Sequence, residues 1–182
     1  MPPPVTAGAV PRPSIPVRNT LAYAAPELFW GMTWALSIDG PMVAAYRDSF
    51  GGGESFVGLA WLFGSLCIGI PGLFSALWVE PLRHKRTFVF WGHIAGGVAL
   101  LIGAALIRGW APSGTFGASA AYLLAVSAFF LAIGIKLPGW LALVGELFEG
   151  GMQSRVLGIT FVVNKIAAII GGQLIARSIL AT

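Results

Sequence analysis

The chain has 182 residues, of which 57% are hydrophobic and 10% are charged, and its mean hydropathy is +0.83. Because a water-soluble domain carries about 25% charged residues, these charges are too few to cover a soluble surface, and we predict an integral membrane protein. The net charge of +4 comes from basic residues near the ends of apolar runs, which indicates membrane topology and argues against nucleic acid binding.

Residues 1–20 contain six of the twelve prolines and two arginines, without a long apolar run. This composition is typical of a disordered segment, and we expect a Pro-rich tail on the cytoplasmic side. No apolar stretch follows the start of the chain closely enough for a cleaved signal peptide.

Five apolar segments follow, each long enough for a helix to cross about 30 Å of hydrocarbon. We predict transmembrane helices at about residues 26–45, 55–79, 88–107, 118–144 and 156–179. The predicted fold class is therefore all-α, a polytopic membrane bundle of about five helices within residues 21–182.

Proline and glycine interrupt the first two predicted helices. Gly40 and Pro41 follow Asp39 and should kink the first helix, which is tolerated where protein or water surrounds the break. Asp39 is therefore expected to face inward. In the second helix, Pro71 predicts a further kink. The single cysteine, Cys67, cannot form an internal disulfide and is interpreted as a packing residue.

A charged turn, Glu80-Pro81-Leu82-Arg83-His84-Lys85-Arg86, separates the second and third predicted helices. Basic clusters are retained on the cytoplasmic side, so this turn orients the chain with its N-terminus inside. Six basic residues then lie inside (Arg12, Arg18, Arg83, Lys85, Arg86 and Arg155) and three lie outside (Arg47, Arg108 and Arg177).

Lys136, near the end of the fourth predicted helix, has two interpretations. If the helix continues to Val144, Lys136 lies about two turns inside the membrane. If it ends at Leu137, Lys136 is a cytoplasmic anchor that snorkels to the surface. We favour the longer helix.

Ionisable groups inside a span cost at least about 2.5–3.5 kcal/mol each, so they persist where they pair or line water. The candidates for binding a substrate or coupling ion are Asp39, Lys136, Asn164 and Lys165. Asp39 and Lys165 can form an ion pair that either couples binding to movement or only holds two helices together. Asn164 either contacts substrate or bonds a neighbouring helix. For Glu27, at the predicted helix start, we favour a structural role.

The stretch from Ala76 to Arg86 resembles the G-x-x-x-D-R-x-G-R-R loop between the second and third helices of major facilitator superfamily transporters. Glu80 takes the acidic position, and the basic cluster is Arg83, Lys85 and Arg86. The pattern departs from the family where Ala76 replaces a glycine, Pro81 the first arginine and Arg83 the second glycine. Leu137 to Phe148 with Ser154 to Gly158 is similar to that family's passage from the fourth helix to the fifth.

The resemblance covers residues from about 26 onward and implies the N-terminal half of such a transporter, truncated after the fifth of its twelve helices. It implies that Asp39, Lys136 and Lys165 lie near a transport cavity. It also implies that His93 is on a helix that faces away from this cavity, and for His93 we favour packing over a proton relay. Glu80 and the basic cluster would either latch one state of the bundle by pairing with Arg155 and its loop or only retain positive charge inside.

We therefore expect a secondary active transporter, or a fragment of one, that moves a small solute across the cell membrane by alternating access, with proton coupling left open. A partner chain is a possible source of the missing helices. The alternative is a non-transporting membrane subunit or degenerate remnant that packs against a partner protein. Because the sequence shows no catalytic set, metal-ligand pattern or phosphate loop, we expect neither an enzyme nor a cofactor.

The predicted orientation is tested with reporter fusions. A reporter fused after Arg86 should be cytoplasmic and one fused after Gly114 external, because the basic turn at 80–86 is retained inside. Alkaline phosphatase and fluorescent protein activities measure the two locations. The opposite pair of readouts would invert the topology.

Overall fold

The computed structural model describes residues 17–37, 53–110 and 116–180. These residues form α1 (Val17–Ser37), α3 (Gly53–Val79), α4 (Lys85–Trp110), α5 (Phe116–Leu147) and α6 (Gly150–Leu180), and none of them lies in a strand. The all-α prediction is confirmed for this part of the chain. Four of the helices, α3 to α6, are long and apolar enough to cross a membrane.

The helices begin earlier or end later than the hydropathy pattern suggested. α1 begins at Val17, so residues 17–20 are helical and do not belong to the expected disordered tail. Pro26 lies inside α1 rather than in its first turn. Burial stabilises the part of α1 that precedes Pro26, because Thr20, Tyr23 and Ala24 all pack into the interior. The break expected at Asp39 to Pro41 lies outside the described residues.

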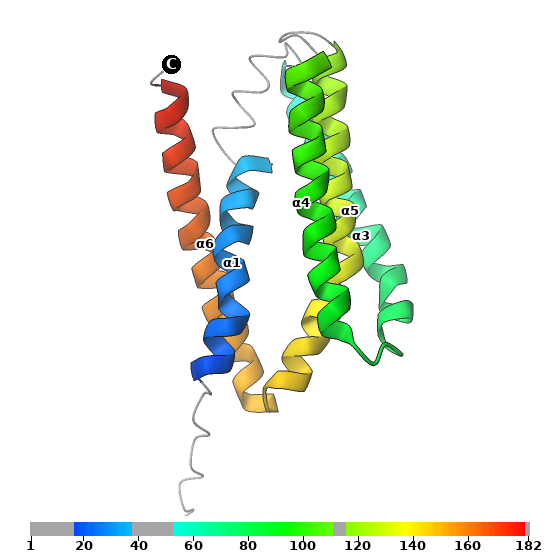
Figure 1. Ribbon diagram of the computed structural model, residues 1–182, viewed down its shortest axis with the longest axis vertical. Coiled ribbons are helices and arrows are strands. Elements are labelled where there is room, and N and C mark those ends of the chain that lie inside the picture. Colours follow the sequence, from blue (N-terminus) through cyan, green and yellow to red (C-terminus); the bar gives the residue numbers. More distant parts are fainter. Residues whose placement is uncertain (1–16, 38–52, 111–115, 181–182) are drawn as a thin grey trace, which may run out of the picture.

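The five helices form two groups (Figure 1). In the first group α5 packs along α4 on one side and along α3 on the other, and in the second α1 packs along α6. The groups meet where the last turns of α5 swing toward the start of α6. This bend follows Pro138, which lies inside α5 and lacks the N–H that would continue the helical ladder.

A close approach between α3 and α5 is made possible by Gly134. A Cβ atom added there would lie 2.6 Å from the carbonyl oxygens of both Cys67 and Ile68, so only glycine fits. Pro138 leaves the Gly134 carbonyl without its helical donor, and the buried Ser75 hydroxyl of α3 donates to it over 3.4 Å. The backbone irregularity of α5 is thus accommodated by α3.

We call the end where α1, α4 and α6 begin and where α3 and α5 finish the basic end (Figure 1). Among the described residues, this end carries Arg18, Arg83, Lys85, Arg86 and Arg155, and the opposite end carries Arg108 and Arg177. Large apolar side chains cover much of the outer surface between the ends, which suits a bundle surrounded by lipid.

Replacing Gly134 by Ala should lower the free energy of unfolding by about 1–3 kcal/mol, because the added methyl group meets rigid backbone on α3. Gly69→Ala is the matched control, since a Cβ atom at Gly69 meets nothing within 4 Å. Unfolding in mixed detergent and dodecyl sulfate micelles measures both. Equal effects of the two substitutions would contradict close packing at Gly134.

Candidate functional site

Four helices each contribute one polar side chain to a cluster in the interior, which we call the polar cluster: Glu27 of α1, His93 of α4, Lys136 of α5 and Asn164 of α6. Glu27 and Lys136 are only 7% and 3% exposed. Counted from Val17 and from Leu147 at about 1.5 Å per residue, both lie about 15 Å from the basic end. That distance is half of a hydrocarbon core of about 30 Å.

The first pair in the polar cluster joins α1 to α6. The Asn164 amide donates to the Glu27 carboxylate over 3.0 Å in a buried hydrogen bond. Gly31, one turn after Glu27, permits this contact, because a Cβ atom there would overlap the Asn164 carbonyl oxygen. The glycine lets the two backbones approach, and the amide then reaches the acid.

The second pair joins α4 to α5. The Nζ atom of Lys136 lies 2.6 Å from Nε2 of His93, while Nδ1 of His93 lies 2.8 Å from the Val89 carbonyl oxygen. Since a carbonyl only accepts, Nδ1 carries the ring proton, and Nε2 of the neutral ring accepts from Lys136. Gly92 brings the helices together here, because a Cβ atom at that position would lie 2.6 Å from the Lys136 Cβ atom.

Trp30 of α1 connects the two groups of helices at this depth. Its ring lies 3.7 Å below the Lys136 ammonium nitrogen and packs against the His93 ring at a centroid distance of 5.2 Å. A cation over an indole face is stabilised by the ring quadrupole, more so where water is absent. The opposite charges of Glu27 and Lys136 also attract each other.

A cavity of about 180 Å³ lies beside the polar cluster, between α1, α5 and α6, and we call it the polar cavity. Its charged lining consists of Glu27, Lys136 and Lys165. Aromatic rings form much of the remaining wall, from Trp30, Trp34, Trp140 and Phe161. The Lys165 ammonium lies 5.9 Å from the Trp34 ring, and its side chain is exposed.

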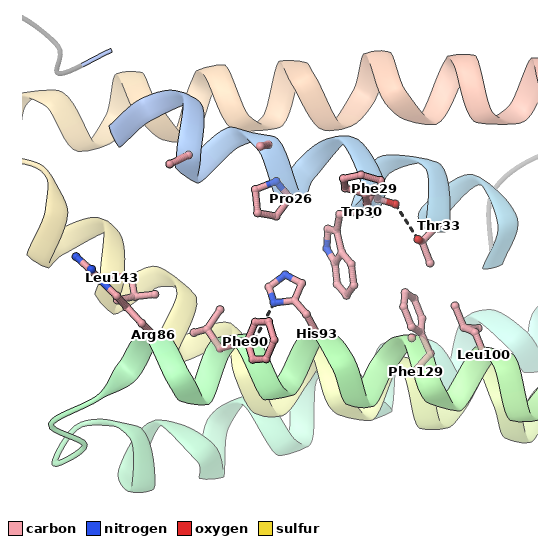
Figure 2. A pocket seen from close by; sticks show the side chains of 14 residues that line it. Pro26, Phe29, Trp30, Thr33, Arg86, Phe90, His93, Leu100, Phe129 and Leu143 are labelled. Atoms are coloured by element: carbon pink, nitrogen blue, oxygen red, sulfur yellow. Dashed lines mark hydrogen bonds between the residues drawn. The ribbon is translucent and has the colours of Figure 1, made fainter. Parts of the chain in front are cut away.

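A second cavity, of about 670 Å³, lies between α1 and α4, and we call it the apolar groove (Figure 2). Figure 2 shows Trp30 pointing from α1 and His93 pointing from α4 into the space between these helices. Phe29, Phe90 and Leu100 are among the residues that line it. Trp30 borders both cavities.

Aromatic contacts join the two groups of helices near the basic end. Tyr23 of α1 stacks on Trp140 of α5 at 5.2 Å and donates its hydroxyl to the Trp140 carbonyl over 2.9 Å. Its ring also meets the edge of Phe148. Trp140 also lines the polar cavity, so these contacts connect α1 to the wall of that cavity.

The charged turn and the end of α5 are linked by one ion pair, between Lys85 and Glu146 at 2.5 Å. This pair joins the two segments that were expected to exchange charge contacts, through Lys85 of the basic cluster and an acid near the start of the loop that ends at Arg155; its role as a latch stays a prediction. Within the described part of the chain, the side chains of the other four residues of the expected latch, Glu80, Arg83, Arg86 and Arg155, form no hydrogen bond or ion pair. Half of the Glu146 side chain is exposed, so the pair adds little stability.

The structure tests several expectations about single residues. Lys136 lies inside a continuous α5 that extends to Leu147, which confirms the longer helix, and Asn164 bonds a neighbouring helix. Asp39 lies outside the described residues, so its pairing with Lys165 stays a prediction. His93 was expected on a helix that faces away from the transport cavity, with packing favoured over proton relay. It is not among the residues that line the polar cavity, but it lines the apolar groove and accepts from Lys136, so it does more than pack.

Sequence reasoning also missed Glu27. It was placed at a helix start, whereas it lies ten residues inside α1 and is buried. A signal existed, because a carboxylate inside an apolar helix requires a partner. The helix was predicted to start near residue 26, which placed Glu27 at its beginning and not in its interior.

Comparison of the chain with models of protein families, with curated proteins and with solved structures finds no match. The argument for function therefore depends on the polar cluster and the two cavities. The polar cavity is the part of the chain where two lysines, one carboxylate and several aromatic rings lie together.

The coupling of Glu27 and Lys136 can be measured with a double-mutant cycle. Glu27→Gln and Lys136→Met should each lower the free energy of unfolding by about 1 kcal/mol or more, because each leaves an opposite charge buried without compensation. The double variant should lose less than the sum of the two. Unfolding in dodecyl sulfate gives the four values.

Arg177→Met is the control for this cycle, since Arg177 is exposed and lies in the last turn of α6, far along the helix from Asn164. Its coupling to Glu27→Gln should stay below about 0.5 kcal/mol, the usual limit of additivity for independent sites. Strict additivity of Glu27→Gln with Lys136→Met would show that the two charges do not stabilise each other.

Proposed function

We propose that this chain forms part of a secondary active transporter similar to those of the major facilitator superfamily, which moves a small anionic solute across the cell membrane by alternating access. The chain would be oriented with its N-terminus in the cytoplasm. A partner chain or further helices would cover the side of the bundle that carries Lys165.

The observation that carries this proposal is the position of Lys165. It lies 15 residues inside α6, about 22 Å from the basic end, and its side chain is exposed. An exposed ammonium at this depth is costly against hydrocarbon. This side of the bundle is therefore suited to water or to another protein surface, as a transport pathway requires.

The lining of the polar cavity favours an anionic solute. Lys136 and Lys165 supply two cations against the single carboxylate of Glu27, so an added anion balances the site. The indole rings of Trp30 and Trp34 offer flat apolar surfaces for the rest of the solute. A volume of about 180 Å³ suits a small molecule.

The division of the bundle into two groups supports movement. α1 packs along α6 and α5 packs along α3 and α4, while the two groups share only limited helix contact. The links between the groups are made by side chains, chiefly the rings of Tyr23, Trp30 and Trp34 of α1, which pack on residues of α4 and α5. Such an interface favours rigid-body rocking of one group against the other.

Alternating access can be tested without knowing the solute. In a Cys67→Ala background, a cysteine introduced by Leu137→Cys lines the polar cavity. A charged, membrane-impermeant maleimide should label it in both right-side-out and inside-out vesicles, because each state opens the cavity to one side. Mass spectrometry measures the labelled fraction.

The control is Phe63→Cys on α3, which lies on the exposed apolar surface and should resist the charged maleimide from both sides. Labelling of Leu137→Cys from one side only would contradict alternating access. Absence of labelling from both sides would favour the alternative, a non-transporting subunit that packs against a partner protein.

A further inference from the structure

The apolar groove differs in chemistry from the polar cavity on the other side of Trp30. Phe29 and Phe90 line it with 74% and 58% of their surfaces exposed. Its polar wall groups are already satisfied, because Thr33 donates to the Phe29 carbonyl and both ring nitrogens of His93 have partners. The wall of the groove thus offers an apolar surface to whatever fills it.

One cation lies among the residues of the groove. Arg86 is in the first turn of α4, at the basic end, with its side chain exposed. Figure 2 shows its guanidinium group at the end of the groove that lies near Leu143. Both α1 and α4 begin at this end, and the positive ends of their dipoles add to the attraction for an anion.

The length of the groove matches one leaflet of a bilayer. Along α4 its lining extends from Arg86 to Leu100, about 21 Å at 1.5 Å per residue. Half of a bilayer including its headgroups is about 20–22 Å thick. A spanning protein helix would require contact over the whole hydrocarbon core of about 30 Å, which this groove does not provide.

We propose that the apolar groove binds one anionic phospholipid from the leaflet at the basic end. An acyl chain lies against Phe29, Phe90 and Leu100, and the phosphate is bound by the guanidinium of Arg86, which is suited to bidentate contact with phosphate oxygens. The site is distinct from the polar cavity, with which it shares the Trp30 ring as a common wall.

Native mass spectrometry of the purified full chain in mild detergent tests this proposal. Phosphatidylglycerol and phosphatidylcholine with the same acyl chains are the two probes. The chain should retain one phosphatidylglycerol with about fivefold preference over phosphatidylcholine, the factor expected for one basic side chain at the membrane surface.

Arg86→Gln should reduce that preference to about onefold, because it removes the phosphate contact. Arg83→Gln is the matched control, since Arg83 belongs to the same basic end but does not line the groove, and it should keep the preference. An equal loss in both variants would overturn the site, because it would show attraction to the overall charge of this end.

Gly97→Phe tests the acyl-chain contact separately. Gly97 lines the groove and a Cβ atom there meets nothing within 4 Å, so a larger side chain can begin there without displacing a neighbouring helix, and the ring should occupy the groove and lower the binding of both lipids at least fivefold. Gly69→Phe on α3, where a Cβ atom also meets nothing, should leave binding unchanged. Helicity by circular dichroism and a single elution peak verify that each variant folds. If Gly97→Phe does not fold, Gly97→Leu is used in its place.

Two further results would overturn the proposal. Unchanged lipid binding by Gly97→Phe would place the lipid elsewhere on the bundle. Retention of a second copy or of another protein chain, without any bound lipid, would show that a protein surface covers the groove.

Discussion

The interaction on which the centre of this bundle depends is the burial of the Lys136 ammonium group. It lies eleven residues before the end of α5 and contacts His93 of α4 and Trp30 of α1, while Glu27 supplies the opposite charge. Insertion of a lysine at this depth costs at least about 2.5–3.5 kcal/mol. Each contact offsets part of that cost, and because Trp30 and Glu27 come from α1, the lysine ties the pair α4 and α5 to the other group of helices.

α5 can hold this residue because its own irregularities are matched by its neighbours. Gly134 admits the backbone of α3, and Gly92 of α4 admits the Lys136 side chain. Pro138 follows within one turn and lies at the bend that carries Trp140 to Tyr23. The same short stretch therefore packs tightly on α3 and α4 and reaches the second group of helices. In the rocking motion that we propose, this stretch is the pivot.

Hydropathy predicted the helical class, the approximate positions of α3 to α6 and the inward continuation of α5 past Lys136, because these depend on local composition and length. The pairs at the centre could not be predicted in this way. Glu27 with Asn164 and His93 with Lys136 join residues 137 and 43 positions apart. Apolar periodicity is nearly uniform around such helices, so it did not show which face of α4 meets α5 or that the acid of α1 meets the amide of α6.

Trp30 lies between two cavities whose walls differ in chemistry. The polar cavity contains three charged side chains and is poorly suited to lipid, whereas the apolar groove presents exposed phenyl rings and is poorly suited to water. The indole of Trp30 borders both, with Lys136 over its face. The ring also covers the Lys136–His93 pair, since it packs against the imidazole and lies under the ammonium group. An acyl chain in the groove would hold the ring in place from the lipid side, which gives the lipid a structural role in the wall between the two cavities.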